Sequence, residues 1–203
     1  MTPPYVAGDL PPSQVRDLMA EPRRRRAAAN AFPIAMDTRL SPDHHAFLRE
    51  AVRLAEEADK RGNLPIASVI TLDGKVVARG MNSIWRPAYE LTRHAEMEAL
   101  RNVPSHLWWR SREMTLFTTL EPCLMCAGAI LLHHLGHLVF GSADPTGGIA
   151  ACIDSLPSYF KQEFDLIQWR GPALPEECDP LYARVIERER RRGPSPPMDF
   201  ADA

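Results

Sequence analysis

The stretch MTLFTTLEPCLMCAGAILLHHLGHLVFGS, residues 114–142, places two kinds of regular structure in succession. Its two ends, 114–120 and 137–142, are rich in β-branched and aromatic residues and predict strands. The apolar run between them, 123–134, predicts a helix that opens with a Cys-x-x-Cys motif. Strands that alternate with helices are typical of a sheet covered by helices, so this stretch indicates the fold class.

The rest of the chain continues the alternation. Ser41 as N-cap, Pro42 in the first turn and Gly62 as the stop signal indicate a helix, and Asp73-Gly74 between two β-rich runs indicates a hairpin. We therefore expect an α/β fold: a three-layer α/β/α sandwich whose mixed sheet of about five strands starts antiparallel and has helices on both faces. The further expected elements are helices over 41–62, 93–103 and 176–192, a hairpin over 64–82 and a strand over 164–169. The expected buried faces are Phe47, Ala51, Leu54, Ala55 and Ala58 in the first helix and Cys178, Leu181, Tyr182 and Val185 in the last.

Three segments are expected along the 203 residues, a length that suits one domain with a sizeable core. Residues 1–40 are rich in proline and arginine and predict a mobile N-terminal extension. Within it, Arg23–Arg26 could instead contact phosphates or belong to a processed leader. Residues 41–192 hold the alternating elements and form the expected functional domain, and 193–203 predict a disordered tail.

The composition argues against several classes of protein. No apolar run approaches the roughly 18 residues that span a bilayer, and the N-terminus lacks the basic-then-apolar pattern of a secretory signal. We therefore expect a cytoplasmic protein with no membrane partner, whose four cysteines do not form a disulfide framework. The net charge of -2 argues against the broad basic surface of a dedicated nucleic-acid binder.

A histidine and a glutamate, His94 and Glu96, stand near the start of the predicted helix over 93–103. Helix starts on the same edge of an alternating sheet converge, so we expect His94 to meet Cys123 and Cys126. A helix N-terminus lowers the pKa of a thiol, and one imidazole with two thiolates suits a zinc ion that keeps its fourth position open for catalysis. Glu96 is then placed to carry protons beside the ion.

Two other interpretations of the cysteine pair stay open. A structural zinc site would need a fourth protein ligand and would have no use for the nearby glutamate. A thiol redox module would need neither the histidine nor the glutamate. The candidate fourth ligands and the two remaining cysteines, all of which we expect to be packing or surface residues, are His133, His134, His137, Cys152 and Cys178.

The pattern His94-Ala95-Glu96, followed by Pro122-Cys123-Leu124-Met125-Cys126, matches the H-x-E…P-C-x-x-C signature of zinc nucleobase deaminases. Over roughly residues 43–192 the chain resembles the cytidine deaminase-like superfamily, the CMP/dCMP-type deaminase domain. The stretches TLEPCLMCAGAI and HLVFGSAD are similar to the branch that holds bacterial tRNA adenosine deaminases and guanine deaminases. The resemblance implies a hydrolytic enzyme with one zinc ion per chain, which converts an amino group of a nucleobase or nucleoside to a carbonyl and releases ammonia.

The resemblance also implies roles for single residues and a mode of assembly. Family members commonly form homodimers or larger assemblies through helices near the site, so we expect a homodimer here. The residues that the resemblance assigns are His94, Cys123 and Cys126 as zinc ligands, Glu96 as the proton shuttle, and Asn82 and the backbone of Ala95 as contacts to the substrate base.

This sequence departs from the family pattern at two positions and in its charge. Ala67 stands where relatives usually have glycine, which adds a methyl group close to the pocket wall. Arg93 replaces an alanine before the zinc histidine and could face solvent or meet an anionic group. Because tight tRNA binding needs cations against many phosphates, the net charge of -2 favours a free nucleobase or nucleoside as the substrate, with adenosine in a tRNA anticodon loop as the alternative.

Overall fold

The computed structural model describes residues 40–192 of the chain. Within this range, no helix has the length and apolar character that crossing a membrane requires. The N-terminal extension with Arg23–Arg26 and the tail over 193–203, both predicted above, lie outside the described residues. The helices are α2 (Pro42–Lys60), α3 (Ala95–Arg101), α4 (Leu124–Leu132), α5 (Ser158–Leu166) and α6 (Pro175–Arg192), with 3-10 turns η1 (Ser105–Glu113), η2 (Ile149–Ala151) and η3 (Ile153–Ser155). The strands are β1 (Ala67–Leu72), β2 (Lys75–Met81), β3 (Thr115–Leu120), β4 (His137–Ser142) and β5 (Gln168–Arg170).

The five strands form one mixed sheet in the order β2-β1-β3-β4-β5. β1 pairs antiparallel with both β2 and β3, whereas β3, β4 and β5 run parallel. The hairpin turn at Asp73 and Gly74 has positive φ at both residues, as the Asp-Gly signal predicted. The α/β fold with a mixed five-stranded sheet and an antiparallel start is therefore confirmed.

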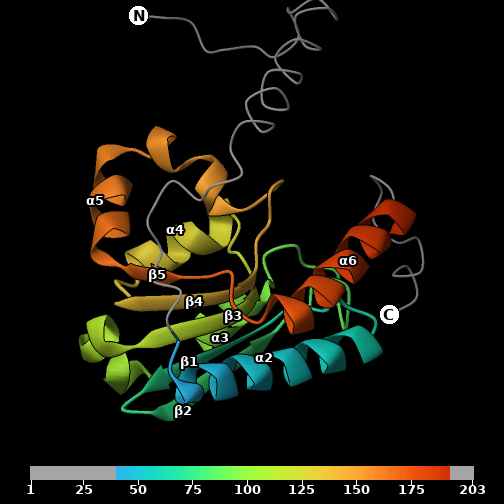
Figure 1. Ribbon diagram of the computed structural model, residues 1–203, viewed down its shortest axis with the longest axis horizontal. Helices are drawn as coiled ribbons and strands as arrows, with labels where there is room; N and C mark the ends of the chain where they lie inside the picture. Colours follow the sequence, from blue (N-terminus) through green and yellow to red (C-terminus); the bar gives the residue numbers. More distant parts are fainter. Residues whose placement is uncertain (1–39, 193–203) are drawn as a thin grey trace, which may run out of the picture. The chain divides into compact units, whose positions relative to one another are not determined.

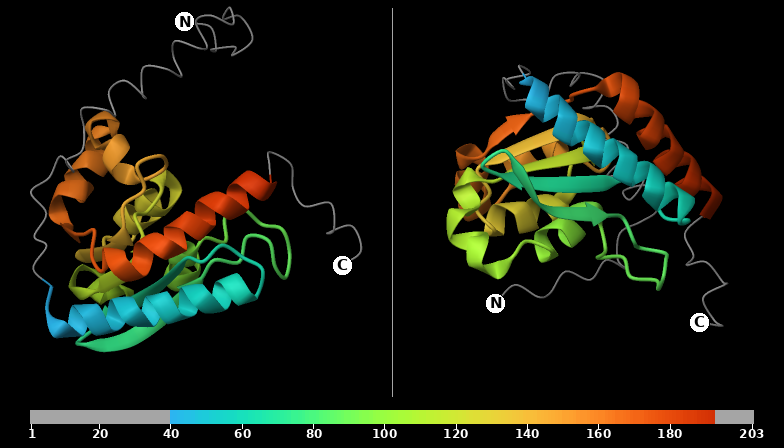
Figure 2. Two further views of the ribbon diagram at one scale, coloured as in Figure 1. Left: turned by 45° about the vertical axis from the view of Figure 1, so that its right-hand side comes forward. Right: turned by 90° about the horizontal axis from the view of Figure 1, so that it is seen from below.

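Helices cover both faces of this sheet (Figures 1 and 2). α2 and α6 lie side by side on one face, where α2 contacts β1 and β3 and α6 contacts β4. α3 packs on β1 and β2 from the other face, next to α4, which in turn contacts α5. The three layers predicted from the sequence are present, and α3 and α4 are neighbours in the layer opposite α2 and α6.

The first helix begins where the sequence predicts. Ser41 is the N-cap, its side chain accepts a hydrogen bond from the backbone N–H of His44, and the ring of His44 accepts one from the backbone N–H of Ser41. The buried face differs in one detail, since Leu48 is fully buried whereas Phe47 and Leu54 are only partly buried. The last helix buries Cys178, Leu181 and Val185 as expected, with Tyr182 partly buried beside them.

The strand expected over 164–169 is largely wrong. Residues up to Leu166 belong to α5, and β5 starts only at Gln168. Phe164 and Ile167 are buried while Leu166 is 62% exposed, a spacing of three that fits a helical turn and not strand alternation. The apolar residues of this short stretch therefore belong partly to the end of a helix and partly to the start of a strand.

Candidate metal centre and active site

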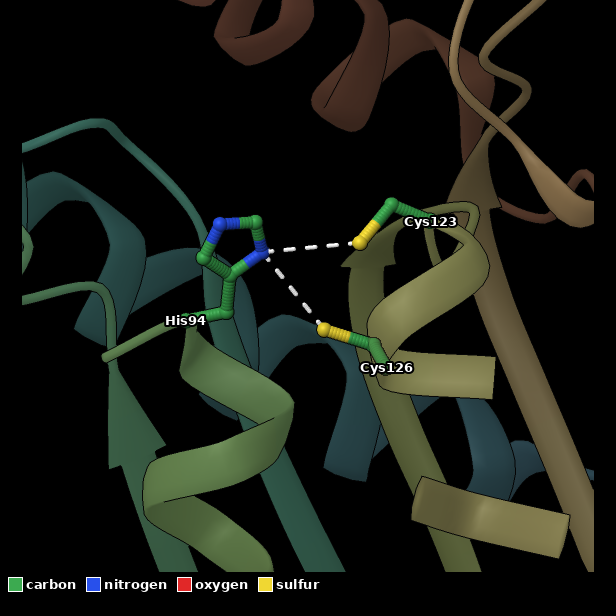
Figure 3. Close-up of side chains that lie close together, drawn as sticks. All are labelled: His94, Cys123 and Cys126. Carbon is green, nitrogen blue, oxygen red and sulfur yellow. Dashed lines mark hydrogen bonds between the residues drawn. The ribbon is translucent and has the colours of Figure 1, made fainter. Parts of the chain in front are cut away.

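Two helix starts bring the predicted site residues together. His94 is the N-cap of α3, and Cys123, which follows β3 after Glu121 and Pro122, is the N-cap of α4. Neither side chain caps its own helix, and both point toward the space between the two helices (Figure 3). Cys126, in the first turn of α4, points into the same space and is fully buried.

The three side chains have the spacing of ligands around one ion. Nδ1 of His94 lies 3.6 Å from Sγ of Cys123 and 3.5 Å from Sγ of Cys126. A tetrahedral zinc ion, with Zn–S of about 2.3 Å and Zn–N of about 2.1 Å, separates a sulfur from a nitrogen by about 3.6 Å. All three ligand atoms lie within 4.8 Å of one another, and within residues 40–192 no fourth His, Cys, Asp or Glu joins the group.

The electrostatics of the cluster also suit a cation. The hydrogen bond from Cys126, helped by His94, lowers the pKa of Cys123 to about 4. The same pairing, together with burial, raises the pKa of Cys126. A divalent cation deprotonates a thiol that it coordinates, so the cluster can supply two thiolates and one imidazole to a single zinc ion. One nitrogen and two sulfur donors are a ligand set that zinc prefers, and three protein ligands leave a fourth position for a reacting molecule.

Glu96 lies beside this cluster in the first turn of α3. Its side chain is buried, with Oε2 3.5 Å from Sγ of Cys126. The hydroxyl of Thr118 on β3 donates a hydrogen bond of 3.2 Å to the other oxygen, Oε1. Burial raises the pKa of Glu96 above the usual value of a glutamate. The structure therefore places a carboxyl group where it can exchange protons with a molecule bound next to the metal ligands.

Asn82 follows β2 and lies close to the start of α3, because the backbone N–H of Ser83 donates a hydrogen bond to the carbonyl of Arg93. The Asn82 side chain is buried, and its Oδ1 accepts a hydrogen bond of 3.4 Å from the backbone N–H of Ile84. Its Nδ2 has no partner among the described residues. A buried amide donor without a partner is costly, which is typical of a group that a ligand satisfies. Ala95, the other predicted contact, is fully buried at the first position of α3.

Sequence reasoning missed a group of residues that hold the loop after β4 next to Cys123. The carboxylate of Glu121 accepts hydrogen bonds from the backbone N–H groups of Asp144 (3.0 Å) and Ala150 (2.9 Å). Asp144 in turn accepts one of 2.8 Å from the hydroxyl of Tyr182 on α6. An acidic residue directly before Pro122 was the available signal, but its partners lie more than 20 residues away and could not be read from the sequence.

The remaining candidates lie away from the cluster or have other partners. His133 stacks on Trp108, with ring centroids 4.3 Å apart, and His134 pairs with Glu163 at 2.9 Å. Cys178 is buried between α6 and the sheet. These residues, together with the half-buried Cys152 and His137, do not belong to the metal-ligand group.

The structure shows the contacts of the two residues that depart from the family pattern, Arg93 and Ala67. Arg93, which lies just before α3, pairs with Glu98 of that helix at 3.0 Å. The methyl group of Ala67 packs with Ala55 of α2 and Leu181 of α6, on the face of the sheet opposite α3. The expectation that this methyl group lies close to the pocket wall is therefore wrong, because strand alternation points it to the other layer.

Known proteins match the same region of the chain. The profile of the family described as the cytidine and deoxycytidylate deaminase zinc-binding region matches residues 41–142. A tRNA-specific adenosine deaminase of Bacillus subtilis (strain 168) is 31% identical over 149 residues, 72% of this chain and 90% of that protein. One of Streptococcus pyogenes serotype M18 is 37% identical over 149 residues, 72% of this chain and 91% of that protein.

A solved structure agrees with these sequence matches. It comes from a study of A-to-I editing by tRNA:A34 deaminases at the wobble position of transfer RNA, and it is 34% identical to this chain. The match covers 57% of this chain and 92% of that chain, with a TM-score of 0.52. The segment that the family profile matches includes Asn82, His94, Glu96, Cys123 and Cys126.

Proposed function

Because the chain belongs to the family of the cytidine and deoxycytidylate deaminase zinc-binding region, and is thus a zinc-dependent hydrolytic deaminase of nucleobases or nucleosides, we propose that it acts on adenosine in a tRNA anticodon loop. The observation that carries this choice is the match to two tRNA-specific adenosine deaminases over 90% and 91% of their length. This substrate was the alternative in the sequence-based expectation, which favoured a free nucleobase or nucleoside.

We assign the zinc ion to His94, Cys123 and Cys126, whose spacing and donor atoms support that role. Zinc, when bound, lowers the pKa of a water molecule and so provides a nucleophile for the amino-bearing carbon of the base. Oε2 of Glu96 would carry two protons in turn, one from that water to a ring nitrogen and the other from the hydroxyl group gained by the ring carbon to the amine that leaves as ammonia. The burial of Glu96 and its 3.5 Å distance from the Cys126 sulfur support this assignment.

The experiment that tests this assignment compares two substitutions on α3. Glu96→Gln should keep one zinc ion per chain and lose turnover by about 10²- to 10⁴-fold or more, since one residue serves two proton transfers. Glu98→Gln is the matched control, because Glu98 lies on the same helix and pairs with Arg93 and Arg101 instead. A Glu96→Gln protein with near wild-type ammonia release would show that Glu96 has no catalytic role.

The base is held, in this proposal, by Asn82 and the backbone N–H of Ala95. Nδ2 of Asn82 is a buried donor without a described partner, and a ring nitrogen of a purine is a matching acceptor. The N–H groups in the first turn of a helix have no partner within the helix, so Ala95 at the start of α3 has one to offer. These two donors would orient the amino-bearing carbon toward the metal ligands.

A free nucleobase or nucleoside remains the second candidate substrate, and the charge distribution favours it. Arg184 and Arg188 both pair with Asp59, and Arg191 pairs with Glu187, so several arginines of α6 already have acidic partners. The test measures ammonia release from an unmodified tRNA, adenosine, guanine and cytosine at low and moderate salt. Turnover on tRNA that falls steeply with salt supports the tRNA proposal, and salt-independent turnover on a small substrate alone contradicts it.

We further propose a homodimer that forms through α4. Leu124, Met125 and Leu132 are 58%, 37% and 56% exposed on this helix, so its surface offers apolar area for a second copy. Leu132→Glu should shift the protein to a monomer in analytical ultracentrifugation. Trp109→Glu removes a side chain that is 82% exposed on η1 and is the control that should leave the assembly unchanged.

The proposal includes a cytoplasmic location. All four cysteines are free thiols in the structure, which suits a reducing compartment. The proposed tRNA substrate would also be present in the cytoplasm. Fractionation of cells that express the full chain checks this location, and recovery outside the cytoplasm would contradict it.

A further inference from the structure

Two buried hydroxyl groups connect the centre of the sheet to Glu96. Ser68 on β1 and Thr118 on β3 are direct partners in the antiparallel register, and both are fully buried. The hydroxyl of Ser68 donates a hydrogen bond of 3.0 Å to Oγ1 of Thr118, and the hydroxyl of Thr118 donates one of 3.2 Å to Oε1 of Glu96. The three side chains thus form a chain of donors that ends on the carboxyl group.

The neighbouring positions show how unusual this polar pair is for its surroundings. Ile70 and Leu116, the next cross-strand pair on the same face, are both buried and apolar. A hydroxyl group in such a core costs free energy unless it finds a hydrogen-bond partner. The Ser68 hydroxyl donates its proton to Thr118, and the Thr118 hydroxyl donates its proton to Glu96. Both hydroxyl protons therefore have an acceptor, and both hydrogen bonds run toward the carboxyl group.

With zinc bound as proposed, the two carboxyl oxygens of Glu96 have different roles. Sγ of Cys126 lies 3.5 Å from Oε2, but a sulfur that binds zinc is a thiolate and has no proton to donate. Oε2 is then left to exchange protons with the reacting molecule, while Thr118 continues to hold Oε1. A glutamate side chain has three rotatable bonds, so a fixed donor to one oxygen restricts the position of the other.

We propose that Ser68 and Thr118 are positioning residues, which hold Oε1 of Glu96 so that Oε2 faces the reacting molecule. The inference rests on the proposed role of Glu96. Thr118 acts directly on the carboxyl group, and Ser68 acts through Thr118 by fixing the direction of its hydroxyl group. A positioning role predicts a loss in kcat and little change in KM, because the hydrogen bond orients a proton carrier and does not touch the substrate.

Thr118→Val tests the proposal because it removes the hydroxyl group and keeps the side-chain shape. We expect kcat to fall by about 10- to 100-fold with KM changed by less than about twofold. Thr118→Ser keeps the hydroxyl group and should recover most of the rate. Ser68→Ala should cost about fivefold, and it should cost almost nothing more when Thr118 is already valine, because residues that act in series are not additive.

A second measurement does not depend on turnover. In zinc-loaded protein labelled with ¹³C-glutamate, the carboxyl carbon of Glu96, assigned by its absence in Glu96→Gln, should shift in Thr118→Val and stay in place in Thr118→Ser. An unchanged resonance in Thr118→Val would overturn the proposal, as would an unchanged kcat.

A failure of the positioning role can be distinguished from a failure of the proposed role of Glu96. If Glu96→Gln is inactive and Thr118→Val is as active as wild type on the tRNA or the small substrates, only the positioning role is wrong. If Glu96→Gln retains full activity, the proposed function of Glu96 fails and this inference fails with it. Zinc content and thermal unfolding of each variant identify a loss of rate that comes from a damaged fold, which would count against a positioning role.

Discussion

Gly80 marks the point where α3 lies directly on the sheet, and replacing it tests how closely the site depends on that contact. A Cβ at this position of β2 would lie 2.1 Å from the carbonyl oxygen of Ala95 and 2.2 Å from the backbone nitrogen of Ala99. Both are backbone atoms, so no side-chain rotation can relieve the overlap. Ordinary contact begins near 3.4 Å, so α3 has to retreat by about 1.3 Å to relieve the shorter contact in a Gly80→Ala protein.

The expected cost of this retreat appears in stability and in rate. Overpacking of a well-packed core costs about 1–3 kcal/mol, which lowers the melting temperature of a domain of this size by roughly 2–12 °C. His94 is the N-cap of α3 and Glu96 lies in its first turn, so the retreat displaces a proposed metal ligand and the proposed proton carrier together. A misplacement of about 1 Å costs about 10²-fold in rate, and we expect kcat to fall by that factor.

Thermal unfolding, zinc content and ammonia release of Gly80→Ala measure the three effects. Gly128→Ala on α4 is the matched control, with both variants made in the Leu132→Glu background that removes the proposed dimer contact, since nothing in the chain lies within 4 Å of an added Cβ there. Its folded state should gain about 0.5–1 kcal/mol, because alanine favours a helix over glycine. A Gly80→Ala protein with wild-type stability and rate would refute the reasoning that backbone contact with β2 fixes the position of α3.

Three further predictions concern single side chains of the site and the core. Cys126→Ala should lose zinc and melt at a lower temperature, because bound metal stabilises the folded state; full zinc occupancy measured by mass spectrometry would contradict the ligand assignment. Asn82→Ala should raise KM more than it lowers kcat, which steady-state kinetics can separate, and an unchanged KM would remove Asn82 from substrate binding. Burial raises the pKa of Cys178 to about 12, so iodoacetamide at pH 8 should modify the half-buried Cys152 before Cys178 in zinc-loaded protein. Peptide mapping that finds Cys178 modified first would contradict its buried placement.

The sequence predicted those features that depend on local signals. The helix that starts after Ser41, the Asp73-Gly74 turn and the strand–helix–strand unit over 114–142 each rest on neighbouring residues, and each is present. The meeting of the histidine with the two cysteines followed from a general rule for helix starts on one sheet edge.

Features that depend on distant pairings could not be read in the same way. Thr118 looks like an ordinary strand residue until the register places it opposite Ser68 and under Glu96. Glu121 could not be connected with the backbone of Asp144 and Ala150, because their loop has no periodic pattern to place it. The strand predicted over 164–169 was largely wrong because a short segment with four apolar residues in six fits the end of a helix as well as a strand.

The pairing of the first described helix with the last one also has a consequence for how the chain is made. Asp59 on α2 binds Arg184 and Arg188 on α6, partners that the ribosome adds more than 120 residues later. Until then, Leu48 of α2 and Phe117 of β3 lack Cys178 and Leu174, with which they share a cluster. An incomplete chain that stops before α6 would expose this apolar surface, so we expect such nascent or truncated forms to aggregate and to need a chaperone.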